Sequence, residues 1–330
     1  MFGAVVLRRH LSRQPLLNAP MIAQRVKHRR RVISAMIWRV GSGRVRVTMW
    51  HGDVDRNDLF TGNPMTIMID GNRVNYEMDG PTSAPVVMLS HALATNLCLW
   101  DPQTEVLARN FRVLRYDTLG HGSSGAPPGP YSLDQLARQA AGLLDALGIA
   151  RAHFLGLSMG GMIAQTLALI RPQSVASLLL CDTSSRIPPE AQTLWRERIR
   201  IAENEGMEPL VEPTIARWFT APFRAAHLDV IERIRGMIRG TPSSGYAACC
   251  HAIAALDLTD RLQAIQAPAL VIVGEEDQGM PVAMSRTIHE RIAGSEMVIL
   301  SSASHLSNVE QPQAFNRAVT AFLDRVAGKA

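Results

Sequence analysis

Residues 153–162 read HFLGLSMGGM, an apolar run that ends in the pattern Gly-x-Ser-x-Gly. The part before Ser158 has the length and composition of a buried strand, and the apolar segment Met162 to Ile170 predicts a helix directly after it. Glycines two residues before and after the serine permit a very sharp turn, in which the serine itself is strained at the start of the helix. This segment therefore predicts a nucleophilic serine on a strand–turn–helix unit.

Short apolar segments of the same kind occur on both sides of this unit. They predict strands at Val86–Leu89, Val113–Tyr116, Ser177–Leu180, Ala269–Val273 and Met297–Leu300, and a closing helix from about Gln311 to Val326. Segments of helical length separate these strands, as in parallel sheets that are covered on both faces. Alternating residues on either side of Asp70-Gly71 predict an antiparallel hairpin. We therefore expect an α/β fold with a mostly parallel, doubly wound sheet that opens with an antiparallel N-terminal hairpin.

The chain divides into four segments by composition and periodicity. Residues 1–64 form a basic N-terminal extension, and residues 65–183 and 256–330 are expected to form the two parts of the α/β core. The strand rhythm stops between them, and residues 184–255 predict a helical cap inserted over the sheet.

The N-terminal extension accounts for the basic character of the whole chain. Residues 1–63 contain 12 Lys and Arg against 3 Asp, whereas the rest of the chain contains 22 against 26 acidic residues. Such a tail is typical of a transit peptide, of an arm that binds nucleic acid or anionic lipid, or of upstream sequence joined to a protein that starts at Met65. We favour the third interpretation, and we expect the extension to be mostly disordered.

Composition and charge narrow the functional classes. A chain that is 47% hydrophobic and 19% charged is typical of a folded enzyme, and its acidic body predicts no nucleic-acid partner. Apolar runs stay shorter than the 18 or so residues that span a membrane, and four cysteines without C-x-x-C spacing favour a reducing, cytoplasmic location. Metal-ligand clusters, phosphate loops and dinucleotide fingerprints are missing from the sequence, so we predict no metal and no cofactor. The oligomeric state is left open.

Two polar residues follow the later strands in the order that serine catalysis requires. A serine hydroxyl is a poor nucleophile near neutral pH and needs a base that is itself oriented by a carboxylate. Asp277 comes just after one predicted strand and His305 just after the next. Because the carboxyl ends of parallel strands meet at one edge of a sheet, we expect Ser158, Asp277 and His305 to form a catalytic triad.

Other roles remain open for these residues. Glu275 or Glu276 could supply the acid, Asp277 could cap the helix that begins near Pro281, and His305 could be structural. The loop 116–124 also contains an Asp and a His, for which we favour a structural role.

The tetrahedral intermediate of such a reaction needs two N–H donors for its oxyanion. The backbone N–H of Met159, directly after the nucleophile, is expected to be one. The loop after the strand Val86–Leu89 is expected to provide the other, from the N–H of Leu93.

With these residues assigned, residues 65–327 resemble the α/β-hydrolase family, and within it the 3-oxoadipate enol-lactonases. The segments that carry the closer likeness are Trp100–Gln103, Val113–Thr118, Pro127–Leu133, Gly156–Met162, Arg217–Thr220, Gly245–Cys250 and His305–Pro312. The resemblance implies that the chain opens a small-molecule lactone, 3-oxoadipate enol-lactone, to a 3-oxo dicarboxylate during the catabolism of aromatic acids.

The resemblance also suggests which residues bind the substrate. A substrate carboxylate needs a cation or N–H donors, for which Arg217 and Trp218 in the helical cap and His91 are candidates, beside plain surface and core roles. His91 begins the run HALAT, where typical enol-lactonases have Asn-Ser-Leu-Gly-Thr. A carboxylesterase, a carbon–carbon bond hydrolase of the same fold and a non-catalytic ligand-binding homologue remain the alternatives.

Overall fold

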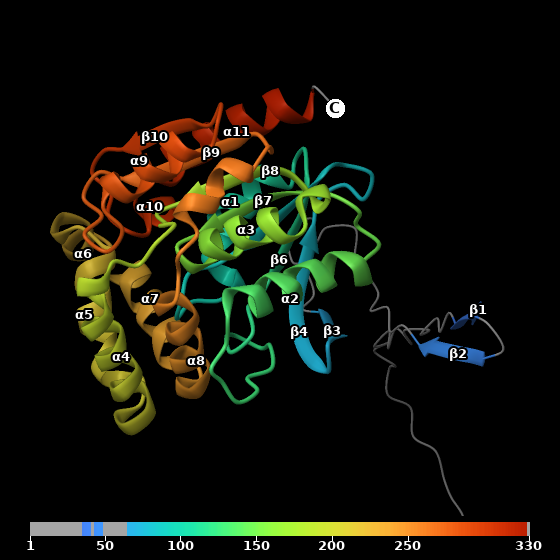
Figure 1. Cartoon of the computed structure of the whole chain (residues 1–330), viewed down its shortest axis with the longest axis horizontal. Helices are drawn as coiled ribbons and strands as arrows, with labels where there is room; N and C mark the ends of the chain where they lie inside the picture. Colours follow the sequence, from blue (N-terminus) through green and yellow to red (C-terminus); the bar gives the residue numbers. More distant parts are fainter. Residues whose placement is uncertain (1–34, 41–42, 49–64, 329–330) are drawn as a thin grey trace, which may run out of the picture. The chain divides into compact units, whose positions relative to one another are not determined.

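The computed structural model describes residues 35–40, 43–48 and 65–328. Its main domain is built on an eight-stranded sheet with helices on both sides (Figure 1). The strands of this sheet are β3 (Met65–Ile69), β4 (Asn72–Asp79), β5 (Val86–Ser90), β6 (Arg112–Tyr116), β7 (Ala152–Leu157), β8 (Val175–Cys181), β9 (Ala269–Gly274) and β10 (Glu296–Leu300). The helices are α1 (Asp101–Leu107), α2 (Leu133–Ala146), α3 (Met159–Ile170), α4 (Gln192–Glu205), α5 (Glu208–Trp218), α6 (Ala221–Ala226), α7 (Leu228–Gly240), α8 (Ser243–Ala254), α9 (Val282–Arg291), α10 (Ser307–Glu310) and α11 (Pro312–Ala327). Short 3₁₀ turns lie at Leu97–Trp100, Pro172–Ser174, Pro189–Ala191 and Thr259–Ala264.

The sheet begins with the predicted hairpin. β3 and β4 are antiparallel, and the turn between them places Asp70 at φ 48° and Gly71 at φ 76°. Two successive left-handed residues are typical of a type I′ turn, which matches the twist of the strands that it joins. β4 also pairs antiparallel with β6, whereas the remaining pairs from β6 to β10 are parallel. The expectation of a mostly parallel sheet with an antiparallel N-terminal hairpin is therefore confirmed.

The strand order β10-β9-β8-β7-β5-β6-β4-β3 explains where the helices lie. The connection from β5 to β6 runs toward one edge of the sheet, and those from β6 to β7, from β7 to β8 and from β9 to β10 run toward the other. Because crossovers between parallel strands are right-handed, α1 lies on one face and α2, α3 and α9 lie on the opposite face. α2 packs against α3, and α11 returns to pack beside α1.

This order also creates a crevice between β5 and β7, because their connections leave in opposite directions. Ligands of open α/β sheets bind at such a switch point, outside the carboxyl ends of the strands. Ser158 follows β7 directly, and the loop after β5 contains Leu93. The fold therefore brings the predicted nucleophile and the predicted oxyanion loop together.

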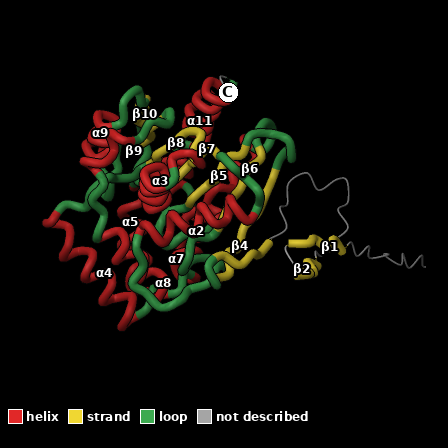
Figure 2. The backbone as a smooth tube through the Cα atoms, turned by 45° about the vertical axis from the view of Figure 1, so that its right-hand side comes forward, coloured by secondary structure: helices red, strands yellow, loops and turns green. Residues whose placement is uncertain are grey.

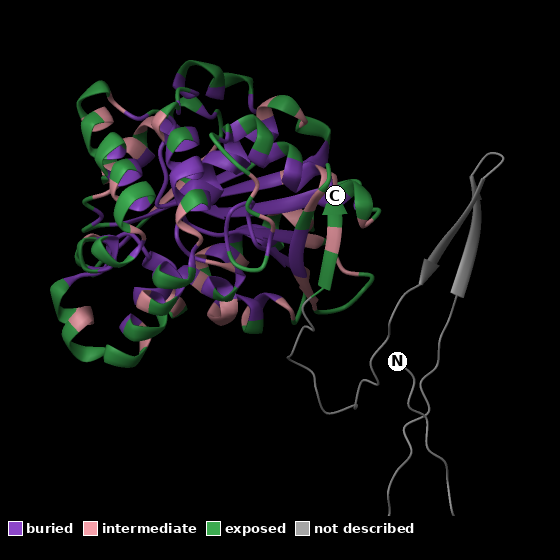
Figure 3. Cartoon of the chain, turned by 90° about the horizontal axis from the view of Figure 1, so that it is seen from below, coloured by how far each residue is buried: buried purple, intermediate pink, exposed green. Residues whose placement is uncertain are grey.

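The centre of the sheet is the core of the domain. β7 and β9 are buried along their whole length, as is most of β8 (Figure 3). Helix α3, which follows the nucleophile, is buried over ten of its twelve residues. The strand–turn–helix unit around Ser158 is thus packed against other elements along most of its length, which fixes the position of the serine.

A helical insertion separates β8 from β9, as predicted. Helix α4 packs against α5 and α8, and α5 packs against α7. These helices, α4 to α8, are called the cap helices below, and they gather at one side of the main domain (Figure 2).

Within residues 1–64 the structure describes one antiparallel pair, β1 (Ala35–Val40) and β2 (Gly43–Thr48). The expectation of a mostly disordered extension otherwise lies outside the described residues. Among the helices that the structure describes, none combines the length and apolar character needed to span a bilayer.

Candidate active site

Ser158 lies in a strained turn between β7 and α3. Its backbone has φ 56° and ψ −114°, outside the regions that L-residues prefer. The neighbouring glycines make this turn possible, because a Cβ on Gly156 would overlap the carbonyl oxygen of Gly160, and a Cβ on Gly160 would overlap that of Ser90. The pattern Gly-x-Ser-x-Gly is therefore a steric requirement of the turn, and the turn presents the Ser158 hydroxyl at the N-terminus of α3.

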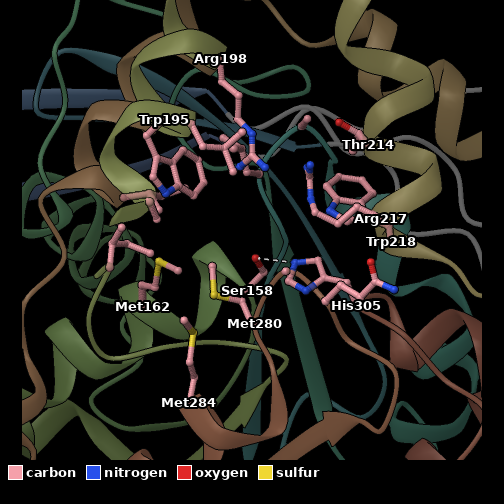
Figure 4. Close-up of a pocket in the computed structure, with 18 of the residues that line it drawn as sticks. Ser158, Met162, Trp195, Arg198, Thr214, Arg217, Trp218, Met280, Met284 and His305 are labelled. Carbon is pink, nitrogen blue, oxygen red and sulfur yellow. Dashed lines mark hydrogen bonds between the residues drawn. The ribbon is translucent and has the colours of Figure 1, made fainter. Parts of the chain in front are cut away.

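The structure brings Ser158, His305 and Asp277 together from three separate loops. His305 Nε2 lies 2.9 Å from Ser158 Oγ, and His305 Nδ1 lies 2.8 Å from Asp277 Oδ2 (Figure 4 shows the first contact as a dashed line). An ionised carboxylate only accepts hydrogen bonds, so Nδ1 must carry a proton. In the neutral imidazole Nε2 is then the acceptor, and the Ser158 hydroxyl donates to it.

The surroundings of Asp277 favour it over Glu275 and Glu276 as the acid. Glu275 and Glu276 are exposed, whereas the Asp277 side chain is fully buried. Asp277 Oδ1 accepts from the backbone N–H groups of Gly279 at 2.8 Å and Met280 at 2.9 Å, while Oδ2 faces His305. Asp277 thus stabilises the turn before α9 with one oxygen and orients His305 with the other.

Two backbone N–H groups have no protein acceptor at this site. In the described part of the chain, neither Leu93 nor Met159 donates its N–H to another group. The N–H of Ala94 donates to His121 Nε2 at 3.0 Å and is therefore occupied. Leu93 and Met159 follow the two strands that flank the crevice, so both N–H groups are available to an oxyanion formed beside Ser158.

The loop that carries Leu93 is held by two buried histidines. His91 donates from Nδ1 to the Ala92 carbonyl at 2.8 Å and accepts at Nε2 from the Thr118 N–H at 3.0 Å. Burial lowers the pKa of His91 to about 4 and that of His121 to about 3, so both rings are neutral at physiological pH. Because both ring nitrogens are already bonded to backbone groups, the structure favours a structural role for His91 over the predicted contact with substrate.

Asp117, in the loop 116–124, also has a structural environment. Its carboxylate accepts from the N–H groups of Leu97 and Ser123 and from the amide of Asn75, each at 2.8 Å. The carboxylate thereby joins three segments of the chain.

A cavity of about 140 Å³ opens above Ser158 between the core and the cap helices. Its core lining includes Leu93, Ala94, Met162, Met280, Met284 and His305, and its cap lining includes Trp195, Arg198, Thr214, Arg217, Trp218 and Tyr246. Arg217 and Trp218, expected from the sequence to bind substrate, both line it. The Trp218 ring lies 6.0 Å from the His305 ring, between centroids, and is almost completely buried.

Two residues of α4 that line the cavity were not predicted from the sequence to belong to the site. Arg198 and Trp195 are one helical turn apart, and the Arg198 Cζ lies 4.5 Å from the centroid of the Trp195 ring. The i, i+3 spacing of an aromatic residue and an arginine was the available signal, but it is also common on exposed helical faces.

Glu310 was also not predicted from the sequence, although both of its carboxylate oxygens accept hydrogen bonds from segments that border the site. Its Oε1 accepts from the N–H and the hydroxyl of Thr220 at 2.9 and 2.8 Å, and its Oε2 accepts from the N–H of Ser304 at 2.5 Å. Burial raises the pKa of the Glu310 carboxyl, and these hydrogen bonds partly offset the rise. Glu310 therefore fastens the residue before His305 to the start of α6.

Within the described residues, no group of three or more His, Cys, Asp or Glu side chains is arranged to hold a metal ion.

Comparison with known proteins gives consistent matches over the main domain. A family model described as alpha/beta hydrolase fold matches residues 85–312. The 3-oxoadipate enol-lactonase 2 of Acinetobacter baylyi is 38% identical over 252 residues, which cover 76% of this chain and 93% of the relative. The crystal structure of the enol-lactonase from Burkholderia xenovorans LB400 superposes with a TM-score of 0.76 at 41% identity, covering 79% of this chain and 100% of that one. A putative carbamate hydrolase, RutD of Stutzerimonas stutzeri, is 28% identical over 261 residues, which cover 78% of this chain and 98% of that protein.

Proposed function

Since this chain belongs to the alpha/beta hydrolase family, we propose that it is a serine hydrolase that opens 3-oxoadipate enol-lactone through Ser158, His305 and Asp277. The observation that carries the proposal is the continuous path of hydrogen bonds from the Ser158 hydroxyl through His305 to Asp277. The similarity to proteins named 3-oxoadipate enol-lactonase supports the choice of substrate.

The first half of the reaction forms an acyl-enzyme. Ser158 Oγ attacks the lactone carbonyl carbon while His305 Nε2 accepts the hydroxyl proton, and Asp277 stabilises the imidazolium that results. The carbonyl oxygen becomes an oxyanion and accepts hydrogen bonds from the N–H groups of Leu93 and Met159.

The bond from the carbonyl carbon to the ring oxygen then breaks. The departing oxygen is an enolate, which stays attached to the acyl group through the carbon chain, and His305 returns its proton to it. The enol becomes a ketone, so the ring does not readily close again. A water molecule next attacks the Ser158 ester with His305 as base, and the products are a free carboxylate and the regenerated hydroxyl.

The size of the cavity supports a small substrate. Its volume of about 140 Å³ is close to the roughly 150 Å³ of an engineered cavity that binds benzene. A five-membered lactone with a short side arm suits such a space better than a long-chain ester does.

We also propose that Arg217 and Trp218 contact this substrate, that the reaction belongs to the catabolism of aromatic acids, and that it takes place in the cytoplasm. The place of Arg217 and Trp218 in the cavity lining supports their contact with substrate, and the named relatives support the role in aromatic-acid catabolism. The four free cysteines support a location in the reducing cytoplasm.

The test is the disappearance of the enol-lactone, followed by absorbance, with purified full-length protein. We expect saturable turnover that is lost in Ser158→Ala and retained in Ser123→Ala, a serine variant outside the cavity. Turnover by Ser158→Ala at the rate of the unmodified protein would refute the proposal.

Parallel assays separate the alternatives. A carboxylesterase would prefer p-nitrophenyl acetate to the lactone, a carbon–carbon hydrolase would cleave ring-cleavage products, and a carbamate hydrolase, the activity named for the relative RutD, would release ammonia from a carbamate. A non-catalytic homologue would turn over none of these compounds.

A further inference from the structure

Two arginine side chains in the cavity lack a partner. Arg198 on α4 and Arg217 on α5 both line the cavity that contains Ser158. Across residues 65–328, no hydrogen bond or ion pair from the structure joins either guanidinium group to another side chain or to the backbone. By contrast, three exposed or half-exposed arginines of the cap helices form ion pairs: Arg200 with Glu197, Arg235 with Glu212 and Arg239 with Glu208.

Arg198 is buried and Arg217 is half-buried. Arg198 is only 9% exposed and is stacked on the Trp195 ring, which restricts its position. Burial, and to a smaller extent repulsion from Arg198, lowers the pKa of Arg217 to about 10, so the Arg217 side chain is still charged at neutral pH. Asp277 is the nearby carboxylate that favours the charged form of Arg217, but it pairs with His305 and makes no ion pair with either arginine. Two cations held close together and partly desolvated are unfavourable, and a bound anion would relieve both the desolvation and the repulsion.

The cavity has a charged side and an apolar side, and Ser158 lies between them. Figure 4 shows Arg198 and Arg217 on one side of Ser158 and the apolar side chains Met162, Met280 and Met284 on the other. A ligand whose carbonyl carbon lies at Ser158 can thus direct a carboxylate toward the arginines while its hydrocarbon part packs against the methionines.

We propose that Arg198 and Arg217 form an anion subsite that binds the free carboxylate of the substrate, so that the enzyme selects small lactones and esters that bear a carboxylate over neutral ones. This inference rests on the proposed function. The two guanidinium groups come from different cap helices and line the same cavity, which makes the subsite depend on the cap as well as on the core. Arg198 is therefore a specificity-determining residue. It binds the carboxylate of the substrate, which lies away from the carbonyl carbon that Ser158 attacks.

A pair of lactones tests the subsite. One is 3-oxoadipate enol-lactone, and the other is α-angelica lactone, which has the same enol-lactone ring with a methyl group in place of the carboxymethyl group. In Arg198→Met we expect the ratio of kcat/KM for the charged lactone to kcat/KM for the neutral lactone to fall about 100-fold, because a charge-assisted hydrogen bond is lost. Arg198→Lys keeps the charge and should retain part of the ratio. Arg200→Met, which removes an exposed arginine of the same helix, should leave the ratio unchanged.

A binding measurement tests the subsite without turnover. Calorimetric titration with adipate, an unreactive dicarboxylate, should show binding that weakens at least about 10-fold in Arg198→Met and is unchanged in Arg200→Met. The neutral 1,6-hexanediol should bind neither protein measurably.

The outcomes distinguish the two proposals. Equal losses for both lactones in Arg198→Met, or adipate binding that does not depend on Arg198, would overturn the anion subsite while leaving the serine hydrolase intact. If the unmodified protein opens neither lactone, the proposed function fails, and the adipate titration alone decides on the subsite.

Discussion

Glu310 offers a sharp test of how the site is held in place. The substitution Glu310→Gln preserves the shape of the side chain but replaces one carboxylate oxygen by an NH₂ group. In the structure both oxygens face donors, namely the N–H and hydroxyl of Thr220 on one side and the N–H of Ser304 on the other. Whichever way the amide turns, its NH₂ group faces a backbone N–H that it cannot satisfy.

The expected loss of stability follows from these contacts. A buried donor without an acceptor costs about 1–3 kcal/mol, and a hydrogen bond to a charged group contributes about 1.5–3 kcal/mol. Since these contributions overlap, we expect Glu310→Gln to lower the free energy of unfolding by about 3 kcal/mol. Because Ser304 precedes His305, the loop that carries the imidazole should also shift, and kcat should fall by about 10-fold or more with a smaller change in KM.

Urea unfolding and steady-state hydrolysis measure the two effects. Glu296→Gln is the matched control, because Glu296 is half exposed and pairs with Arg325 at the surface, where an ion pair contributes about 1 kcal/mol or less. If Glu310→Gln were no less stable and no less active than Glu296→Gln, the role assigned to Glu310 would be wrong.

Three further predictions concern the site and its support. Burial lowers the pKa of His121 to about 3 from an ordinary value of 6.5, so between these values the unfolded chain takes up a proton that the folded chain excludes. This residue should therefore lower the free energy of unfolding by about 2 kcal/mol as the pH falls from 8 to 5. Urea unfolding at the two pH values should show that this contribution is absent in His121→Gln. Gly160→Ala places a Cβ against the Ser90 carbonyl oxygen and should destabilise the protein by about 1–3 kcal/mol, so an unchanged Tm would contradict the steric account of the turn. Asp277→Asn should lower kcat by about 10³- to 10⁴-fold by favouring the wrong tautomer of His305, and a variant with near-normal kcat in steady-state assays would show that another group orients the ring.

Much of the architecture could be predicted because it depends on local patterns. Apolar runs of strand length recur between helical segments, and the glycines around Ser158 mark a turn that few other residues permit. Asp277 and His305 were predicted from the same logic, since each follows a predicted strand whose carboxyl end reaches the edge where the serine lies. Parallel topology then brings distant residues together without further information.

The remaining parts of the site depend on packing between distant segments. Arg198 faces the cavity because α4 packs against α5 and α8, and no local periodicity reports that arrangement. Glu310 accepts from Thr220, which is 90 residues away in the chain. His91 was expected to contact substrate, but its ring nitrogens form hydrogen bonds to backbone groups of its own loop and of a neighbouring loop. Polar residues near a predicted site can thus be assigned to it only when their partners are known.

Covalent labelling of Ser158 tests the convergence of hydroxyl, imidazole and carboxylate most directly. A fluorophosphonate reacts with a serine only when a base has activated its hydroxyl, and peptide mass spectrometry then locates the modified residue. We predict one phosphonylated residue, Ser158, with labelling at least about 100-fold slower in His305→Ala and unchanged in His289→Ala. Modification elsewhere, or a labelling rate of Ser158 that does not depend on His305, would contradict the proposed triad.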